Sequence, residues 1–195
     1  MIRPQLIGMT DHFAVLNEPR RPWLDAEELK EKFHALSVRH HPDVASADSL
    51  DFLLLNAAFN TLREPRSRLR HLLELECPDE LNRARQIPPE LADLFMQIGA
   101  LRQQLEAFLK KQSAAVSPLA QALLAPEKMS LRETVEAQLA TVNERQAKLL
   151  DELRALDARW PAEKPFAQLA SIAHALSFVS KWSEQLREDV VRLAS

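Results

Sequence analysis

The sequence predicts an all-α protein made of an N-terminal helical hairpin and a C-terminal antiparallel three-helix bundle. Its 195 residues are 46% hydrophobic and include only two glycines, and the abundant Leu and Ala favour helices. Twelve prolines divide the chain, because proline begins or ends a helix. Between them apolar residues recur at intervals of three and four, as in helices. The stretches expected to be helical are 23–41, 43–64, 66–77, 90–117, 127–160 and 166–195.

The first helix of the hairpin has a well-marked beginning. Asp25 can cap the free amides, and Glu28 stands at the third helical position, where it completes a capping box. Leu24 and Leu29 flank the cap at the spacing of a hydrophobic staple. We therefore expect this helix to begin at Ala26.

A loop and a second helix complete the hairpin. The first helix should end near His40, because His41 precedes Pro42 and proline disfavours the helical conformation in the residue before it. The second helix is expected from about Ser49 to Arg63. Its apolar stripe consists of Leu55, Ala58, Phe59 and Leu62. Two amphipathic helices joined by a short loop form an antiparallel hairpin.

Residues 76–90 contain Cys77-Pro78 and Pro88-Pro89 and interrupt any helical pattern, so we expect a linker there. The predicted domains are 8–75, 76–90 as the linker, and 91–195. The last domain carries three coiled-coil-like seams. They begin at Leu91, Val135 and Leu169. Expected loops at about 113–129 and 160–165 favour an antiparallel bundle over the alternative, an intermolecular coiled coil. The 113–129 segment suggests an insertion and has no functional interpretation.

Composition excludes several classes of function. The net charge is −3, with both signs mixed along the chain, which argues against a nucleic-acid partner. Gly8 and Gly99 are too far apart for a phosphate-binding glycine loop. Cys77 is the single cysteine, so no thiolate metal site is expected. We find no signal peptide or membrane span and expect a cytoplasmic protein without a cofactor.

His41-Pro42-Asp43 is a compact polar tripeptide on the loop of the predicted hairpin. By itself it is consistent with a turn in which Asp43 caps the next helix. Its flanks carry more information. Together with the tripeptide, the segments 11–16, 37–40 and 55–65 resemble a J-domain over about residues 8–75. The segment 66–75 and the helical C-terminal domain resemble the HscB-type co-chaperones of iron–sulfur cluster assembly.

The resemblance implies a first binding surface. In J-domains the His-Pro-Asp loop and the preceding helix dock on a 70-kDa heat-shock chaperone, here of the HscA or DnaK type, and stimulate its ATP hydrolysis. The residues that match this surface are His41, Pro42, Asp43, Lys30, His34 and Arg39. Lys30 and Arg39 alternatively belong to an ordinary solvated face. Glu27, Glu28 and Glu31 make this helix less basic than the family pattern, which points to weaker or pH-sensitive docking.

A second surface is expected on the bundle. Phe178 and Trp182 lie one residue away from positions of the third apolar seam. Phe95 and Met96 lie in the same way beside the first seam. Such apolar residues mark a binding surface when exposed, or simply widen the buried stripe of a helix. The resemblance implies that this domain binds the scaffold protein IscU through a patch matched by Phe95, Met96, Gly99, Ala100, Gln103 and Phe178, with Trp182 beside it.

The patch departs from the family pattern at three positions. Gly99 and Ala100 stand where the resemblance implies a larger and a charged residue, and Gln103 replaces an acid. These departures bear on which client is bound.

No catalytic or metal site is expected. The histidines offer no pairing of a nucleophile with a base. His34, His40 and His41 with Asp43 form no closed set of metal ligands. We therefore interpret the chain as a co-chaperone and not an enzyme. Two alternatives stay open: a J-type co-chaperone for a different client, and a coiled-coil adaptor with a non-functional J-like hairpin.

Overall fold

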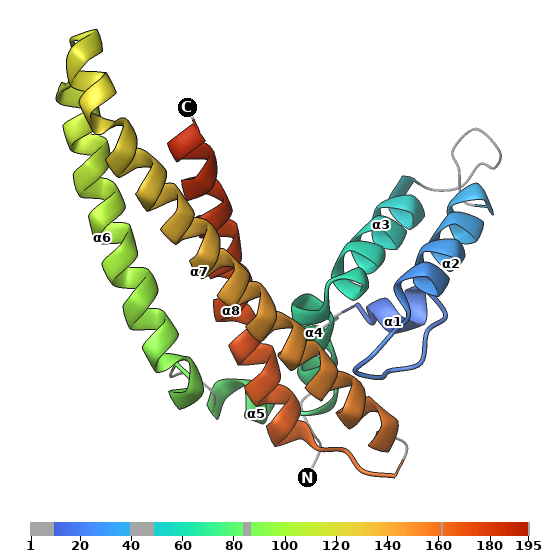
Figure 1. The fold of residues 1–195 in the computed structure, drawn as a ribbon. Coiled ribbons are helices and arrows are strands. Elements are labelled where there is room, and N and C mark those ends of the chain that lie inside the picture. Colours follow the sequence, from blue (N-terminus) through green and yellow to red (C-terminus); the bar gives the residue numbers. More distant parts are fainter. Residues whose placement is uncertain (1–9, 40–48, 84–86, 161, 195) are drawn as a thin grey trace. The chain divides into compact units, whose positions relative to one another are not determined.

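The computed structural model describes residues 10–39, 49–83, 87–160 and 162–194, and within them it contains helices and no strand (Figure 1). The all-α class is therefore confirmed. The helices are α1 (His12–Val15), α2 (Ala26–Arg39), α3 (Ser49–Arg63), α4 (Pro65–Glu76), α5 (Pro78–Arg83), the 3-10 turn η1 (Pro89–Leu91), α6 (Ala92–Ala114), α7 (Pro118–Arg159) and α8 (Phe166–Ala194).

Contacts divide the chain into two compact units. The first unit comprises Met1–Ala84 together with Leu153–Ala173, and the second comprises Arg85–Glu152 together with His174–Ser195. Residues 153–173, which the sequence assigns to the C-terminal domain, thus belong to the same compact unit as the N-terminal region. The expected linker contains α5 and η1.

The beginning of α2 is as predicted. Oδ1 of Asp25 accepts hydrogen bonds from the backbone N–H groups of Glu27 and Glu28, at 2.9 and 3.1 Å. Leu24 and Leu29 are both buried, as a hydrophobic staple requires. The helix begins at Ala26 and ends at Arg39, so the beginning predicted from the capping residues is confirmed.

α2 and α3 form the predicted hairpin. α3 begins at Ser49 and ends at Arg63, as expected. The two helices contact each other through the stacked rings of Phe33 and Phe59, whose centroids are 4.2 Å apart. Leu55, Ala58 and Leu62 of the predicted stripe are buried.

Two buried basic side chains join α4 to the rest of the first unit. The Arg68 guanidinium donates hydrogen bonds to the carbonyls of Pro22 and Leu62, both at 2.8 Å, and burial lowers the pKa of Arg68 to about 10. Nε2 of His71 accepts a hydrogen bond from the N–H of His12 at 3.0 Å. Burial lowers the pKa of His71 below its ordinary value.

The turn between α7 and α8 is held to the N-terminal segment by four residues that we call the clasp: Arg21, Trp23, Asp157 and Trp160. The buried Asp157 carboxylate pairs with the Arg21 guanidinium and accepts the N–H of Trp23 at 3.0 Å. The Trp160 indole N–H donates to the carbonyl of Arg20 at 2.8 Å. These contacts explain why residues 153–173 belong to the first unit.

The second unit is the antiparallel three-helix bundle, formed by α6, residues 118–152 of α7 and residues 174–194 of α8 (Figure 1). The apolar residues of the predicted seams that are buried in the second unit are Leu91, Ile98, Leu101, Leu105, Phe108, Val135, Val142, Leu149, Leu176, Val179, Leu186 and Leu193. Ser183, also in a seam, donates a hydrogen bond to the Asn143 side chain at 3.0 Å.

The predicted loop at 113–129 is wrong. α7 begins at Pro118, where the Ser117 hydroxyl accepts the N–H of Ala120 at 3.1 Å, and the helix continues through Pro126. An internal proline removes one backbone hydrogen bond and costs about 3 kcal/mol. Here the helix is 42 residues long, and the Glu127 carboxylate pairs with Lys111 of α6 at 2.8 Å. The helix thus tolerates Pro126, and an exposed ion pair of this kind contributes little to offset its cost.

Candidate interaction surfaces

The exposed side of α2 carries two of the residues matched to chaperone docking. Lys30 and His34 are both exposed and lie one turn apart. Nζ of Lys30 is 3.7 Å from the carboxylate of Glu27, and both side chains are more than half exposed. Such a pair contributes little and leaves Lys30 accessible to a partner.

The His-Pro-Asp motif itself lies outside the described residues. This applies to His41, Pro42 and Asp43, and also to the side chain of Arg39, the last residue of α2. Their role stays a prediction.

α2 has no net positive charge. Over its 14 residues it contains three acidic residues and three Lys or Arg residues. Lys32 is paired at 2.7 Å with Glu18, whose side chain is almost fully buried. Electrostatic steering by this helix is therefore weak, because steering depends on an excess of one sign of charge.

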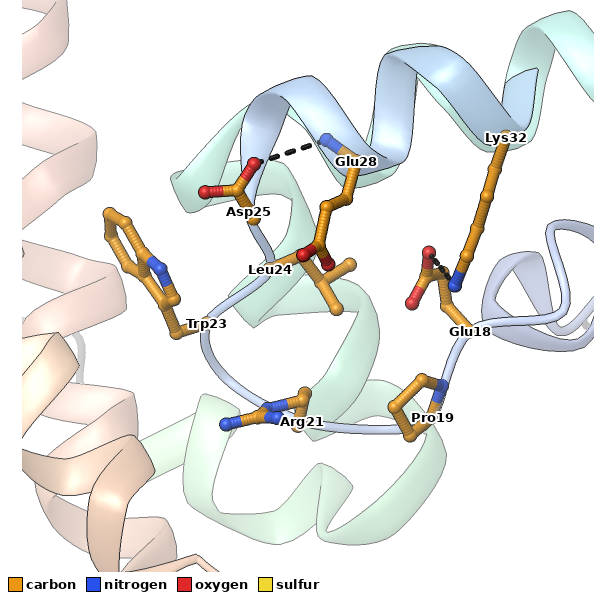
Figure 2. A pocket seen from close by; sticks show the side chains of 8 residues that line it. All are labelled: Glu18, Pro19, Arg21, Trp23, Leu24, Asp25, Glu28 and Lys32. Carbon is orange, nitrogen blue, oxygen red and sulfur yellow. Dashed lines mark hydrogen bonds and ion pairs between the residues drawn. The ribbon is translucent and has the colours of Figure 1, made fainter. Parts of the chain in front are cut away.

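A pocket lies beside the beginning of α2 (Figure 2). It is lined by Glu18, Pro19, Arg21, Trp23, Leu24, Asp25, Glu28 and Lys32. Four of its five charged residues have partners within the first unit: Asp25 caps α2, Lys32 pairs with Glu18, and Arg21 pairs with Asp157. We interpret this pocket as part of the scaffold that fixes the α2 N-terminus.

The second unit presents the predicted apolar patch on α6, which we define as Phe95, Met96, Gly99, Ala100 and Gln103. Phe95 is 43% and Met96 68% exposed, and the other three residues are also exposed. Exposed large apolar side chains grouped in this way are typical of interaction surfaces. Phe178 of α8 is half-buried.

Trp182 does not lie on the exposed face, contrary to the prediction. It is only 5% exposed, and its ring contacts Phe95 and Phe178 at centroid distances of 6.3 and 5.7 Å. A position one residue off the seam still falls within the wide stripe that a bundle helix buries. Trp182 therefore packs against the exposed ring of Phe95 and the half-buried ring of Phe178.

Sequence reasoning missed His174 as a neighbour of this surface. Its ring meets Phe178 edge-on, with centroids 5.0 Å apart and an interplanar angle of 86°. The two residues are four apart on α8, a spacing that places them on one helix face.

Metal-binding clusters and membrane-spanning helices are both absent from the described residues. No group of three or more His, Cys, Asp or Glu side chains there is placed to hold a metal ion. In the same part of the chain no helix is long and apolar enough to cross a membrane.

Comparison with known proteins identifies similar chains. No protein-family model matches the sequence. The J-type co-chaperone JAC1, mitochondrial, of Saccharomyces cerevisiae is 35% identical over 52 residues, which are 27% of this chain and 28% of that protein. The match thus spans less than a third of that relative.

Two solved structures resemble nearly the whole chain. The chaperone HscB from Vibrio cholerae has a TM-score of 0.58 and 21% identity, and the match covers 94% of this chain and 99% of that one. The human co-chaperone protein HscB has a TM-score of 0.54 and 17% identity, with 96% and 83% covered. The chain therefore has the fold of the HscB co-chaperones, and the resemblance expected from its sequence is confirmed.

Proposed function

We propose that this chain is a J-type co-chaperone of iron–sulfur cluster assembly. In this proposal it stimulates ATP hydrolysis by a 70-kDa heat-shock chaperone of the HscA or DnaK type and delivers the scaffold protein IscU to it. The observation that carries the proposal is the extent of the HscB likeness, which covers 94% of this chain and 99% of HscB from Vibrio cholerae. A J-like hairpin and a helical bundle are thus present together.

The first unit supports the chaperone half of the proposal. The capped α2 and its contact with α3 hold a rigid hairpin whose connecting loop carries His41, Pro42 and Asp43. Lys30 and His34 are exposed on the helix that leads to this loop.

The second unit supports the client half. Phe95 and Met96 are exposed on α6 while the seams beneath them are buried. Burying these two side chains against a client would remove apolar surface from water. The client assignment to IscU comes from the resemblance of the patch positions to those of HscB.

A different client is the second candidate, and the composition of the patch favours it. Gly99, Ala100 and Gln103 carry no charge, whereas the resemblance implies charged residues at two of these positions. A client that relies on ion pairs would bind this face poorly.

In the proposed function the chain itself catalyses no reaction, because ATP hydrolysis belongs to the chaperone. Its location in the cell stays a prediction. The similar co-chaperone JAC1 is mitochondrial, whereas the sequence predicts a cytoplasmic protein.

The test is steady-state ATP hydrolysis by purified HscA and DnaK with and without this chain, beside His41→Gln. Stimulation that is lost in His41→Gln and retained in His40→Gln supports the proposal. His40→Gln is a matched control, since it makes the same substitution one residue earlier. Unchanged hydrolysis with either chaperone would contradict the proposal and favour a helical adaptor.

A further inference from the structure

The pocket beside the beginning of α2 has a volume of about 320 Å³ and lies entirely within the first unit (Figure 2). Pockets that hold small ligands measure roughly 300–1,000 Å³, so this one suits a single amino-acid side chain and not a large cofactor. Two ion pairs hold its walls, between Lys32 and Glu18 and between Arg21 and Asp157. The pocket is therefore already formed in the free protein.

Glu28 is the charged residue of the pocket whose carboxylate has no hydrogen-bond or ion-pair partner in the described part of the chain. A complete capping box would use this carboxylate to accept the N–H of Asp25. Asp25 accepts the N–H groups of Glu27 and Glu28, but the return bond is not formed among the described residues. The Glu28 side chain points into the pocket instead (Figure 2). The predicted capping box is thus formed only in part.

Charge determines which ligand the pocket can take. The cations Arg21 and Lys32 each have a carboxylate partner, and Asp25 accepts backbone N–H groups at the positive end of α2. Glu28 leaves the pocket with one negative charge that nothing in the described chain matches. A cation placed here gains an ion pair, whereas an anion is repelled.

The remaining wall of the pocket is apolar and consists of Pro19, Trp23 and Leu24. Leu24 is 7% exposed. The Trp23 ring is held in place by the Arg154 guanidinium, which lies 4.3 Å from the ring centre. The aliphatic stem of a lysine or arginine can lie along such a wall while its charged end reaches a carboxylate. A cation without a stem would leave this wall in water.

We propose that this pocket binds one lysine or arginine side chain of a basic segment in a partner protein, with Glu28 as the counter-charge. The site is distinct from Lys30 and His34, neither of which lines the pocket. An ion pair open to solvent is weak, so the pocket contributes one contact to a larger interface. The proposal does not depend on the proposed function, because it rests on the pocket alone.

Amide chemical shifts of the ¹⁵N-labelled full chain test the proposal, with acetyl-arginine amide and acetyl-lysine amide as probes. Saturable shifts are expected at Trp23, Leu24 and Glu28, with dissociation constants on the order of 1–10 mM. Raising the salt from about 50 to about 500 mM should weaken binding at least about twofold. Acetyl-citrulline amide resembles the arginine probe in shape but has no charge, and should give no saturable shift.

Glu28→Gln keeps the size of the side chain and removes its charge, and it should lower the affinity for both cationic probes at least about threefold. Glu27→Gln is the matched control, because Glu27 is acidic, lies in the same first turn of α2 and does not line the pocket. Equal losses in the two variants, equal shifts with the citrulline probe, or no saturable shift in the wild-type protein would each overturn the proposal.

Discussion

Both compact units have apolar cores, and they differ in the polar side chains that are buried with them. In the first unit the ionisable residues Arg68, His71 and Asp157 are buried, and each is hydrogen-bonded to the backbone of a segment distant in sequence. In the second unit apolar seams predominate, and Asp189 is the buried charged residue among those described. Hydrogen bonds are directional, so in the first unit these polar groups position distant segments in addition to the apolar core, whereas the second unit depends mainly on buried apolar area.

This difference matches the surfaces proposed for the two units. The sequence places the short polar motif His41-Pro42-Asp43 between the two helices of the hairpin. The bundle presents an uncharged apolar patch, which needs only a helix face held by the seams beneath it. Replacing the buried polar residues should therefore lower the stability of the first unit. Charges placed on the patch should weaken client binding by the second unit without unfolding it.

The largest expected effect is the loss of Arg68. Arg68→Met leaves the carbonyls of Pro22 and Leu62 without their buried donor, and should lower the free energy of unfolding by about 3 kcal/mol. Arg70→Met on the same helix is the control. The Arg70 side chain is 73% exposed and pairs with Glu74, so less than about 0.5 kcal/mol is expected. Urea unfolding followed by circular dichroism measures both, and equal losses would refute the contrast.

The clasp should give the next largest effect. Asp157→Ala removes the partner of Arg21 and of the Trp23 N–H, and we expect a loss of about 2 kcal/mol, since Arg21 can be solvated once unpaired. Glu152→Ala on the same helix removes a 3.6 Å pair between Arg145 and a carboxylate side chain that is 52% exposed, and should cost less than about 0.5 kcal/mol. Hydrogen exchange should rise within the first unit alone. Faster exchange throughout the second unit would contradict this assignment of the clasp.

A smaller effect is expected when charge is placed on the patch. Met96→Asp should weaken IscU binding at least about tenfold, because the carboxylate loses hydration in the interface. The matched control is Val191→Asp, at a side chain on α8 that is 67% exposed, close to the 68% of Met96. Both variants should melt like the wild type. If both variants weakened IscU binding equally, the client would bind outside the patch.

The smallest effect is a pH dependence of the first unit. Burial lowers the pKa of His71 and of His12 below 6.5, so both are neutral above that pH in the folded and unfolded states. As the pH falls below 6.5, the unfolded chain takes up protons first and stability falls. His71→Gln keeps an acceptor for the His12 N–H and should flatten the stability profile between about pH 7 and 5. The control His34→Gln, at an exposed position, should leave the stability profile unchanged. An unaltered pH dependence of stability in His71→Gln would contradict the assignment of this dependence to His71.

The sequence predicted the elements that depend on local signals. Asp25 with its staple marked the beginning of α2, and residues at intervals of three and four marked the seams of the bundle. It failed at Pro126, because proline usually ends a helix, whereas α7 continues through this one. Propensity describes a segment alone, and tertiary contacts can override it.

Two features of the candidate sites depended on contacts between distant residues. The clasp joins Trp23 to Asp157 across 134 positions, and no local pattern indicates that pairing. Trp182 was expected on the surface, yet it lies beneath Phe95 and Phe178. Its spacing placed it at the margin of the buried stripe, where the neighbouring helix decides exposure.

The central claim is that one chain carries a chaperone surface and a client surface. ATP hydrolysis by the partner chaperone, measured with this chain and IscU together, tests it most directly, because a bivalent protein raises the local concentration of client at the chaperone. We predict that Met96→Asp loses only the IscU-dependent increment, whereas His41→Gln loses all stimulation. An increment that persists in Met96→Asp, or stimulation that persists in His41→Gln, would contradict the account.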